Sequence, residues 1–314
     1  MPGLAPGVRH FVSASDLTRA GALQLFALAA DLKQRWKAGR RAAPLAGRSL
    51  AMIFEKPSLR TRVTFEVGAH QLGARGVYLS GPEIGLGTRE SVPDVARNLS
   101  RWVDGIVARV YAHATVETLA RHSTVPVINA LSDLEHPCQA LADYFTLWER
   151  GLDPAKVRLA FIGDGNNMCH SLLLLGALLG TSIVVACPPG YEPDVAVQGA
   201  ARRLGGRFEI TEDARAAVTG TDVVYTDVWI SMGQETERER RLEAFGRYHV
   251  GPALLGFAKA SAVFMHCLPA HRGEEVADAV IDGPQSVVLE QAENRLHAQK
   301  AVILDLLGGA VDDA

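Results

Sequence analysis

Short apolar segments alternate with helical patterns along almost the whole chain, and this alternation restricts the possible folds more than any other feature. The segments are Ser49–Phe54, Gly76–Ser80, Gly105–Tyr111, Val125–Leu131, Val157–Gly163, Ser182–Cys187, Asp222–Trp229, Ala262–Leu268 and Ser286–Leu289. Short runs rich in Val and Ile are typical of buried parallel strands. The pattern therefore predicts an α/β protein with two domains, each a mainly parallel β-sheet flanked by helices.

The segment "HPCQALADYFTLWERGLDP" is predicted to be a helix that joins the two domains. Pro137 suits a first helical turn, and Gly151 and Pro154 suit the end of a helix. We expect a first domain of residues 1–140 and a second of residues 141–290, joined by interdomain helices. Apolar residues at near-helical spacing predict a terminal helix over about residues 290–308 that packs back on the first domain.

Composition excludes several classes of protein. The formal net charge is −3, with 32 basic and 35 acidic residues, which is unlike a nucleic-acid binder. The four cysteines lack zinc-type spacing and are predicted to be reduced thiols. The amino terminus lacks the pattern of a secretion signal, and the longest apolar stretch, Leu172–Gly180, is about half of a membrane span. We expect a cytoplasmic protein with no nucleic-acid or membrane partner.

The stretch "SLRTR" follows a predicted strand and opens a predicted helix. The first backbone amides of such a helix lack intrahelical partners and attract an anion. Ser58 and Thr61 add hydroxyl groups, and Arg60 adds a planar fork that matches phosphate oxygens. The pattern favours a phosphate site. The alternative is a serine that caps the helix, followed by arginines on a solvated face.

Four motifs in this order resemble those of the ornithine carbamoyltransferases: "EKPSLRTRVTFE", "HPCQALAD", "DVWISMGQE" and "HCLPAHRGEE". The first two are also shared with the wider aspartate/ornithine carbamoyltransferase superfamily. The resemblance implies transfer of a carbamoyl group from carbamoyl phosphate to the δ-amine of L-ornithine, which gives L-citrulline and phosphate in arginine metabolism. It also implies a homotrimer or a multiple of trimers, and no metal or organic cofactor.

The resemblance assigns a set of residues to carbamoyl phosphate. They are Ser58, Leu59, Arg60, Thr61, Arg109, His136, Gln139, Cys267, Leu268 and Arg295. Within this set, Arg60, Arg109, His136 and Cys267 are the expected catalytic residues. In the family, the residue matching His136 donates to the carbonyl oxygen, which must become an oxyanion, and the residue matching Gln139 accepts from the carbamoyl NH₂. For Arg109 an ion pair with a carboxylate remains the alternative.

The resemblance assigns ornithine to Asn167, Asp227, Ser231 and Met232. Asp227 can pair with an ammonium group, and Met232 can line an aliphatic chain. Without the resemblance, Asp227 is equally well explained as a cap in a turn at a strand end. We expect Cys267 to orient ornithine beside Asp227 and not to act as a covalent nucleophile.

One position departs from the family pattern. Many relatives have glutamine where this chain has Glu83, in a loop that in the family reaches the carbamoyl phosphate of a neighbouring subunit. A carboxylate repels a phosphate unless a cation such as Arg89 lies between them. The resemblance therefore assigns Glu83 to an intersubunit loop, but it carries over no direct contact with the phosphate.

Three other functions are weighed against this hypothesis. A related carbamoyltransferase would use N-acetylornithine, putrescine or aspartate as its acceptor. A nucleotide-dependent dehydrogenase would use "GDGNN", but Met168 stands where the third glycine of the dinucleotide motif belongs. A non-catalytic amino-acid-binding module would bind ornithine without turnover. The dehydrogenase leaves "SLRTR" and "HPCQ" unexplained, and the joint presence of Arg60, Arg109, His136 and Cys267 argues against the binding module.

Overall fold

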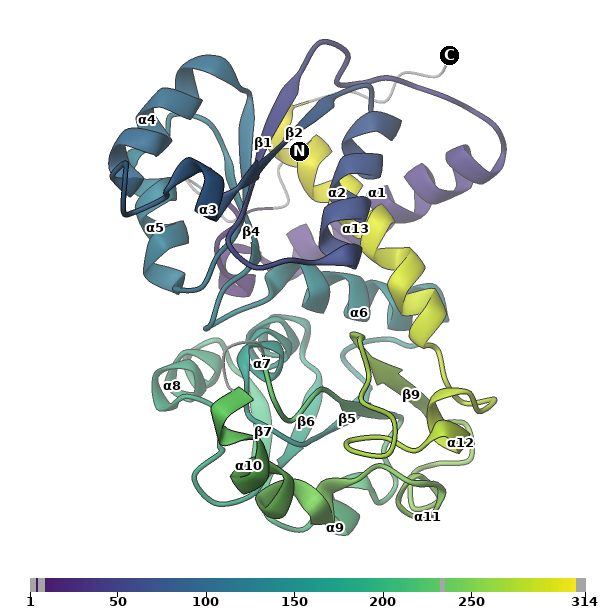
Figure 1. Ribbon diagram of the computed structural model, residues 1–314. Helices are drawn as coiled ribbons and strands as arrows, with labels where there is room; N and C mark the ends of the chain where they lie inside the picture. Colours follow the sequence, from purple (N-terminus) through teal and green to yellow (C-terminus); the bar gives the residue numbers. More distant parts are fainter. Residues whose placement is uncertain (1–3, 5–8, 232–234, 309–314) are drawn as a thin grey trace. The chain divides into compact units, whose positions relative to one another are not determined.

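The structure is a computed structural model that describes residues 4, 9–231 and 235–308 (Figure 1). The chain forms two compact units. Unit 1 comprises Met1–Phe145 and Glu293–Ala314, and unit 2 comprises Thr146–Ala292. The chain passes between them within helix α6 (Pro137–Glu149) and again within helix α13 (Val288–Leu307). Within the described ranges, no helix is both long and apolar enough to cross a membrane.

Unit 1 contains a four-stranded parallel sheet in the order β2-β1-β3-β4. Its strands are β1 (Ser49–Phe54), β2 (Arg75–Ser80), β3 (Gly105–Arg109) and β4 (Val127–Leu131). Its helices include α1 (Arg19–Lys37), α2 (Leu59–Gln71), α3 (Gly81–Ile84), α4 (Val92–Trp102) and α5 (His113–His122). Helices α4 and α5 bury apolar side chains against one face of this sheet.

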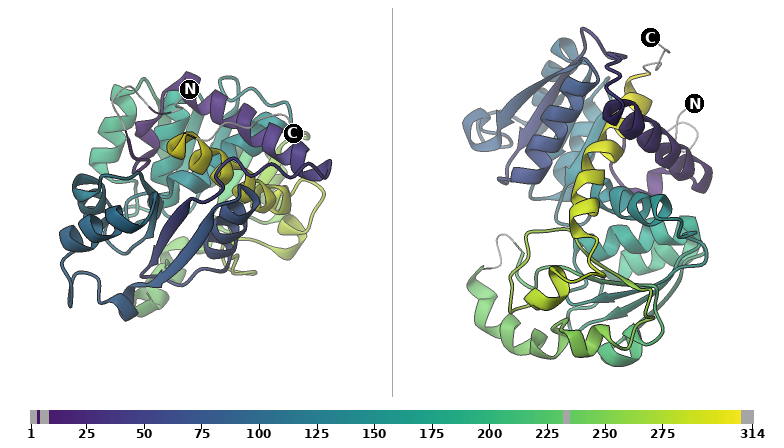
Figure 2. Two further views of the ribbon diagram at one scale, coloured as in Figure 1. Left: turned by 90° about the horizontal axis from the view of Figure 1, so that it is seen from above. Right: turned by 90° about the vertical axis from the view of Figure 1, so that its right-hand side faces the viewer.

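Helices α2 and α13 pack together on the other side of this sheet from α4 and α5 (Figure 1 and Figure 2). Gly68 of α2 permits a close approach, because a Cβ at this position would lie 3.3 Å from Cγ of Lys300. The side chain of Lys300 also donates to Oε1 of Gln71 at 2.9 Å. From Glu293 onward, helix α13 is thus part of the structure of unit 1.

Unit 2 contains a five-stranded parallel sheet in the order β7-β6-β5-β8-β9. Its strands are β5 (Arg158–Ile162), β6 (Ser182–Ala186), β7 (Arg207–Thr211), β8 (Val223–Thr226) and β9 (Val263–His266). Its helices are α7 (Asn167–Leu179), α8 (Val195–Arg203), α9 (Ala214–Val218), α10 (Arg238–Phe245), α11 (Pro252–Leu255) and α12 (Asp278–Ile281). Helices α9, α10 and α11 bury apolar residues in a core that includes strand residues of β5, β6 and β8.

The strand order of each sheet reverses beside its first strand. In unit 1, β1 lies between β2 and β3, and Phe54 pairs with Arg109. In unit 2, β5 lies between β6 and β8, and Ile162 pairs with Thr226. Loops at the carboxyl ends of two such strands diverge to opposite sides and leave a crevice that binds ligands. Each unit therefore has one favoured ligand-binding edge.

The fold class predicted from the sequence is confirmed, with one segment assigned wrongly and one strand missed. Ser286–Leu289 was predicted to be a strand, but Ser286 forms only an isolated bridge and α13 begins at Val288. The missed strand, β7, has a mixture of exposed and half-buried residues along the sequence "RFEIT". It lies at the end of the sheet order, where a strand needs no continuous apolar run.

A buried histidine in α13 should influence how the stability of the protein depends on pH. Burial, followed by the charges of Lys300 and Lys33, lowers the pKa of His297 from 6.5 to about 3. Between these values the unfolded chain binds a proton here that the folded chain does not. The stability due to neutral His297 is therefore complete above pH 6.5 and is lost as the pH falls.

We expect His297→Gln to lower the slope of unfolding free energy against pH, within this interval, by about 1.4 kcal/mol per pH unit. Urea unfolding followed by circular dichroism at a series of pH values measures this slope. Equal slopes for the variant and the wild type would contradict the expected burial of a neutral imidazole.

Candidate active site

The loop between β1 and α2 forms the first part of the site in unit 1. Ser58 is the N-cap of α2, and its hydroxyl oxygen accepts from the backbone N–H of Thr61 at 3.2 Å. Leu59, the first residue of the helix, has a side chain that is 75% exposed. Capping uses a lone pair of the Ser58 hydroxyl and leaves its hydrogen able to donate. The capping role and a role in anion binding are therefore compatible.

Thr61 joins two arginines that are far apart in the sequence. Its hydroxyl oxygen accepts from Nη2 of Arg295 at 3.1 Å and is 3.5 Å from Nη1 of Arg109. Arg109 ends β3 beside β1, and Arg295 comes from α13. Both side chains are buried. The fold thus brings two guanidinium groups to the helix N-terminus that begins with "SLRT".

His136 lies within the field of three arginines. Burial, followed by the charges of Arg295, Arg109 and Arg60, holds the pKa of this imidazole well below 6.5. All three charges thus disfavour the protonated form of this one imidazole. His136 is therefore neutral at physiological pH, with one nitrogen able to donate and the other able to accept.

Gln139 is held in place from both ends of its amide. Its Nε2 donates to Oδ1 of Asp143 at 2.7 Å, and its Oε1 accepts from Nη1 of Arg295. Asp143 lies one turn further along α6. Sequence reasoning missed Asp143, although its spacing of four residues from Gln139 was a usable signal, since such residues share a helix face.

Asp227 is the centre of the candidate site in unit 2. It follows β8, and Asn166 caps the N-terminus of α7 after β5. Oδ2 of Asp227 accepts from Nδ2 of Asn166 at 2.9 Å, and Oδ1 accepts from its neighbour Val228 N–H at 2.8 Å. Sequence reasoning missed Asn166, whose signal was its place directly before a predicted helix after "GDG".

Cys267 lies beside Asp227, as the sequence analysis expected. Its Sγ donates to Oδ1 of Asp227 at 3.0 Å. Leu268 follows with a φ of 58° and a cis peptide bond to Pro269. The other three cysteines are buried, and burial raises the pKa of Cys138 and of Cys187 to about 12. Those two thiols are therefore unreactive at neutral pH.

A buried ion pair links the two loops of unit 2 that carry Asn166 and Asp227. Nη1 of Arg241 donates to Oδ2 of Asp164 and to the backbone oxygen of Trp229, both at 2.9 Å. Burial raises the pKa of Asp164 to about 6, although the charge of Arg241 opposes this shift. Arg241 thus connects the loop after β5 with the loop after β8. Sequence reasoning missed this pair, because nothing in the spacing of the two residues indicates it.

The remaining predicted residues are placed as follows. Asn167 is the first residue of α7, and Ser231 is half-buried in the loop after β8. Met232 lies outside the described residues. Glu83 is exposed on α3, and no ion pair joins it to the exposed Arg89 in the part of the chain that the structure describes.

Among the residues that the structure describes, two groups of side chains have ligand atoms close enough to hold a metal ion. They are Asp227, His266 and Cys267, and His271, Glu274 and Glu275. In the first group, both ring nitrogens of His266 are already engaged, with Glu275 and with the backbone of Leu268. That engagement disfavours coordination by His266.

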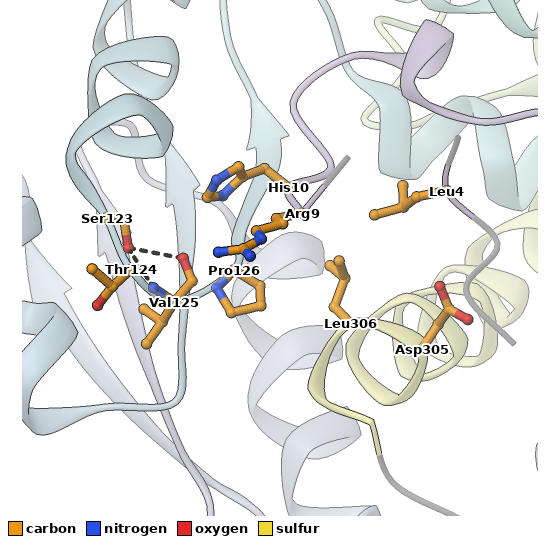
Figure 3. Close-up of a pocket in the computed structure, with 9 residues that line it drawn as sticks. All are labelled: Leu4, Arg9, His10, Ser123, Thr124, Val125, Pro126, Asp305 and Leu306. Atoms are coloured by element: carbon orange, nitrogen blue, oxygen red, sulfur yellow. Dashed lines mark hydrogen bonds between the residues drawn. The ribbon is translucent and has the colours of Figure 1, made fainter. Parts of the chain in front are cut away.

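A cavity of about 280 Å³ lies away from these loops, at the amino-terminal end of β4 in unit 1 (Figure 3). Its wall includes Arg9, His10 and Pro126. His10 accepts from the backbone N–H of Val127 at 3.1 Å. Because ligands of parallel sheets bind at the carboxyl ends of strands, this cavity is not part of the candidate site.

Comparisons with known proteins agree with this geometry. Residues 9–149 match the family model "Aspartate/ornithine carbamoyltransferase, carbamoyl-P binding domain", and residues 155–306 match "Aspartate/ornithine carbamoyltransferase, Asp/Orn binding domain". Among curated relatives, an ornithine carbamoyltransferase of Methanosarcina mazei is 52% identical over 299 residues, which cover 95% of this chain and 99% of the relative.

Solved structures give the same result. An ornithine carbamoyltransferase from Pyrococcus furiosus is 50% identical, with a TM-score of 0.93 over 96% of this chain and 98% of that one. An ornithine carbamoyltransferase from Thermus thermophilus is 45% identical, with a TM-score of 0.86 over 96% of this chain and 99% of that one. The chain belongs to the aspartate/ornithine carbamoyltransferase family.

Proposed function

We propose that the protein is an ornithine carbamoyltransferase, which transfers the carbamoyl group of carbamoyl phosphate to the δ-amine of L-ornithine and releases L-citrulline and phosphate. The main observation in support is that Arg109 and Arg295 converge on Thr61 at the N-terminus of α2. In addition, the charges of three arginines act on buried His136. Relatives about half identical over nearly the whole chain carry this name.

In unit 1, the proposed ligand is the phosphate and carbonyl end of carbamoyl phosphate. Ser58, Leu59 through its backbone, Arg60, Thr61 and Arg109 would bind the phosphate. Guanidinium groups match phosphate oxygens in planar, charge-assisted hydrogen bonds, so a cluster of arginines suits a phosphate. Neutral His136 would donate to the carbonyl oxygen as negative charge develops on it, and Gln139 would accept from the carbamoyl NH₂.

In unit 2, the proposed ligand is ornithine. The buried carboxylate of Asp227 would pair with the δ-ammonium, beside the Cys267 thiol that it already accepts from. Asn167 and Ser231 would bind the amino-acid end, and Met232 would line the chain. Before attack the nitrogen must lose a proton, because its ordinary pKa is about 10.4 and an ammonium has no lone pair. The amine then forms a bond to the carbonyl carbon, the bond to the phosphate oxygen breaks, and the nitrogen gives up its second proton to the departing phosphate.

Further features of the proposal follow from the family. We infer a homotrimer or a multiple of trimers, action in arginine biosynthesis and a location in the cytoplasm. A relative from Pyrococcus furiosus, 54% identical over 277 residues, carries the name "Ornithine carbamoyltransferase, anabolic", which supports the biosynthetic direction. Contributions of Cys267 and Leu268 to carbamoyl phosphate binding, and of Glu83 to a neighbouring subunit, stay predictions.

The acceptor is tested by measuring ureido product from carbamoyl phosphate with ornithine, N-acetylornithine, putrescine, aspartate and lysine offered separately. We expect product with ornithine alone: aspartate has no side-chain ammonium for Asp227, and putrescine has no carboxylate for Asn167. Product with another acceptor would preserve the carbamoyl chemistry and overturn the ornithine assignment. Absence of product with all five would overturn the proposed carbamoyltransferase activity.

The phosphate assignment is tested with two arginines of one helix. We expect Arg60→Ala to lower turnover by about 100-fold or more, as for the loss of one preorganised donor. Arg62→Ala is the matched control, because Arg62 is exposed and pairs with Glu66 on the same helix. Steady-state rates at saturating ornithine compare the two variants. Similar losses in both would show that general positive charge, and not a bound phosphate, is what matters.

The ornithine pocket is tested with Asp227→Asn, which keeps the size of the side chain and removes its charge. We expect a large rise in the KM for ornithine, while the Kd for inorganic phosphate, measured by calorimetry, stays unchanged. Asp222→Asn, which removes a carboxylate paired with Lys259 just before the same strand, is the control. Weakened phosphate binding in Asp227→Asn would mean that the ornithine pocket is wrongly placed.

A further inference from the structure

A buried hydrogen-bonded chain supports the backbone next to Cys267. It begins at Glu275 and passes through His266, the last residue of β9. Both side chains are fully buried, with 0% exposure. Nε2 of His266 lies 3.1 Å from Oε1 of Glu275. Burying a carboxylate costs free energy unless it is hydrogen-bonded, so the buried Glu275–His266 pair is expected to have a structural or functional role.

The hydrogen bonds of His266 define which nitrogen carries its proton. The backbone N–H of Leu268 points at Nδ1 with a nitrogen–nitrogen distance of 2.9 Å. A backbone N–H can only donate, so Nδ1 must accept and carries no hydrogen. The proton of the neutral ring is then on Nε2, which donates to Glu275. The carboxylate thereby selects the tautomer that the Leu268 amide requires.

Leu268 needs such support because of its backbone conformation. Among the described residues other than glycine, it alone has a positive φ, of 58°. L-amino acids disfavour this region, and a residue stays there only when its surroundings hold it. The hydrogen bond from its N–H to His266 is one such constraint, and it lies directly after Cys267.

Glu275 also holds the far end of the same loop. Its Oε1 accepts from the backbone N–H of His271 at 2.6 Å, in addition to His266. Its own backbone oxygen accepts from Val250 N–H at 2.8 Å, which anchors the residue. One carboxylate oxygen therefore joins residues 266 and 271 and closes the loop between them. That loop contains Cys267, whose Sγ contacts Asp227.

We propose that Glu275 is a positioning residue that acts through His266 to fix the Cys267–Leu268 backbone against Asp227. The proposal rests on the proposed function, since Asp227 and Cys267 are taken as the ornithine side of the reaction. It assigns Glu275 no contact with substrate. Its effect is on the position of the ornithine amine relative to the carbonyl carbon. A displacement of a reacting group by about 1 Å can lower the rate by about 100-fold.

The first test observes the tautomer directly and needs no activity. Nitrogen-15 NMR of histidine-labelled full-length protein distinguishes the two ring nitrogens, and His266→Gln identifies the signal. We expect a protonated Nε2 and an unprotonated Nδ1 in the wild type, and the same in Glu275→Gln, whose amide oxygen can still accept. A protonated Nδ1 in the wild type would overturn the proposal, whatever reaction the protein catalyses.

The second test separates positioning from simple stabilisation. We expect Glu275→Ala to lower kcat/KM for ornithine by up to about 100-fold, with a raised KM, while the Kd for inorganic phosphate is unchanged. Glu275→Gln should restore most of the rate. Glu274→Ala is the matched control, because this neighbouring glutamate pairs with Arg238 and has no hydrogen bond to His266.

A merely structural role gives a different result. It would lower kcat in proportion to the folded fraction and leave the KM for ornithine unchanged in Glu275→Ala. If Glu275→Ala does not fold, Glu275→Asp replaces it, because the shorter side chain moves the acceptor away from His266. An unchanged KM for ornithine in folded Glu275→Asp would overturn the proposal. A wild type without ornithine turnover would overturn the proposed function alone, because the tautomer is measured independently.

Discussion

The reversal of strand order beside the first strand of each sheet is the constraint on which both half-sites depend. At β1 and β3 it brings the N-terminus of α2 next to Arg109, and at β5 and β8 it brings the N-terminus of α7 next to Asp227. A helix N-terminus offers amides without intrahelical partners, and the neighbouring strand end offers one charged side chain. The same backbone arrangement thus supplies two sites whose chemistry depends on which charge lies at the strand end.

The two units use that arrangement with opposite charges. In unit 1 the guanidinium groups of Arg109 and Arg295 meet at Thr61, which suits an anion. In unit 2 a carboxylate occupies the equivalent strand end, held by Asn166 and Cys267, which suits a cation. The net charge of −3 gave no hint of this, because each site is built by local clustering. Local clustering of charge, and not the overall charge of the chain, therefore determines which ion each site suits.

Much of the fold could be predicted from sequence because buried parallel strands must be apolar along their length. Ser49–Phe54 was predicted with the bounds that β1 has. The prediction failed for β7, which lies at the end of its sheet order and in which apolar residues alternate with polar ones. It also failed for Ser286–Leu289, where the apolar residues belong to the start of helix α13. Short apolar runs do not distinguish a strand from the first turn of a buried helix.

Candidate site residues could be named from sequence where a motif keeps them together, or where the resemblance supplied a distant residue such as Arg109 or Arg295. "SLRTR" contains its own helix start, and "HPCQ" contains both His136 and Gln139. The contacts of Asp143, Arg241 and Glu275 were not predictable, because each is defined by a partner that only the tertiary fold supplies. Such supporting residues carry no motif of their own, yet they fix the orientation of the side chains that do.

The neutral state of His136 shows why such supporting contacts matter for the chemistry. An imidazole in water is close to half protonated near pH 6.5, and its charge would add to that of the arginines. Burial and the charges of Arg295, Arg109 and Arg60 remove that possibility. What remains is a neutral donor whose N–H can strengthen its hydrogen bond as an oxyanion develops, within a field that already favours negative charge. The arginines thus have two effects at once: they favour an anion at the N-terminus of α2, and they favour the neutral state of His136.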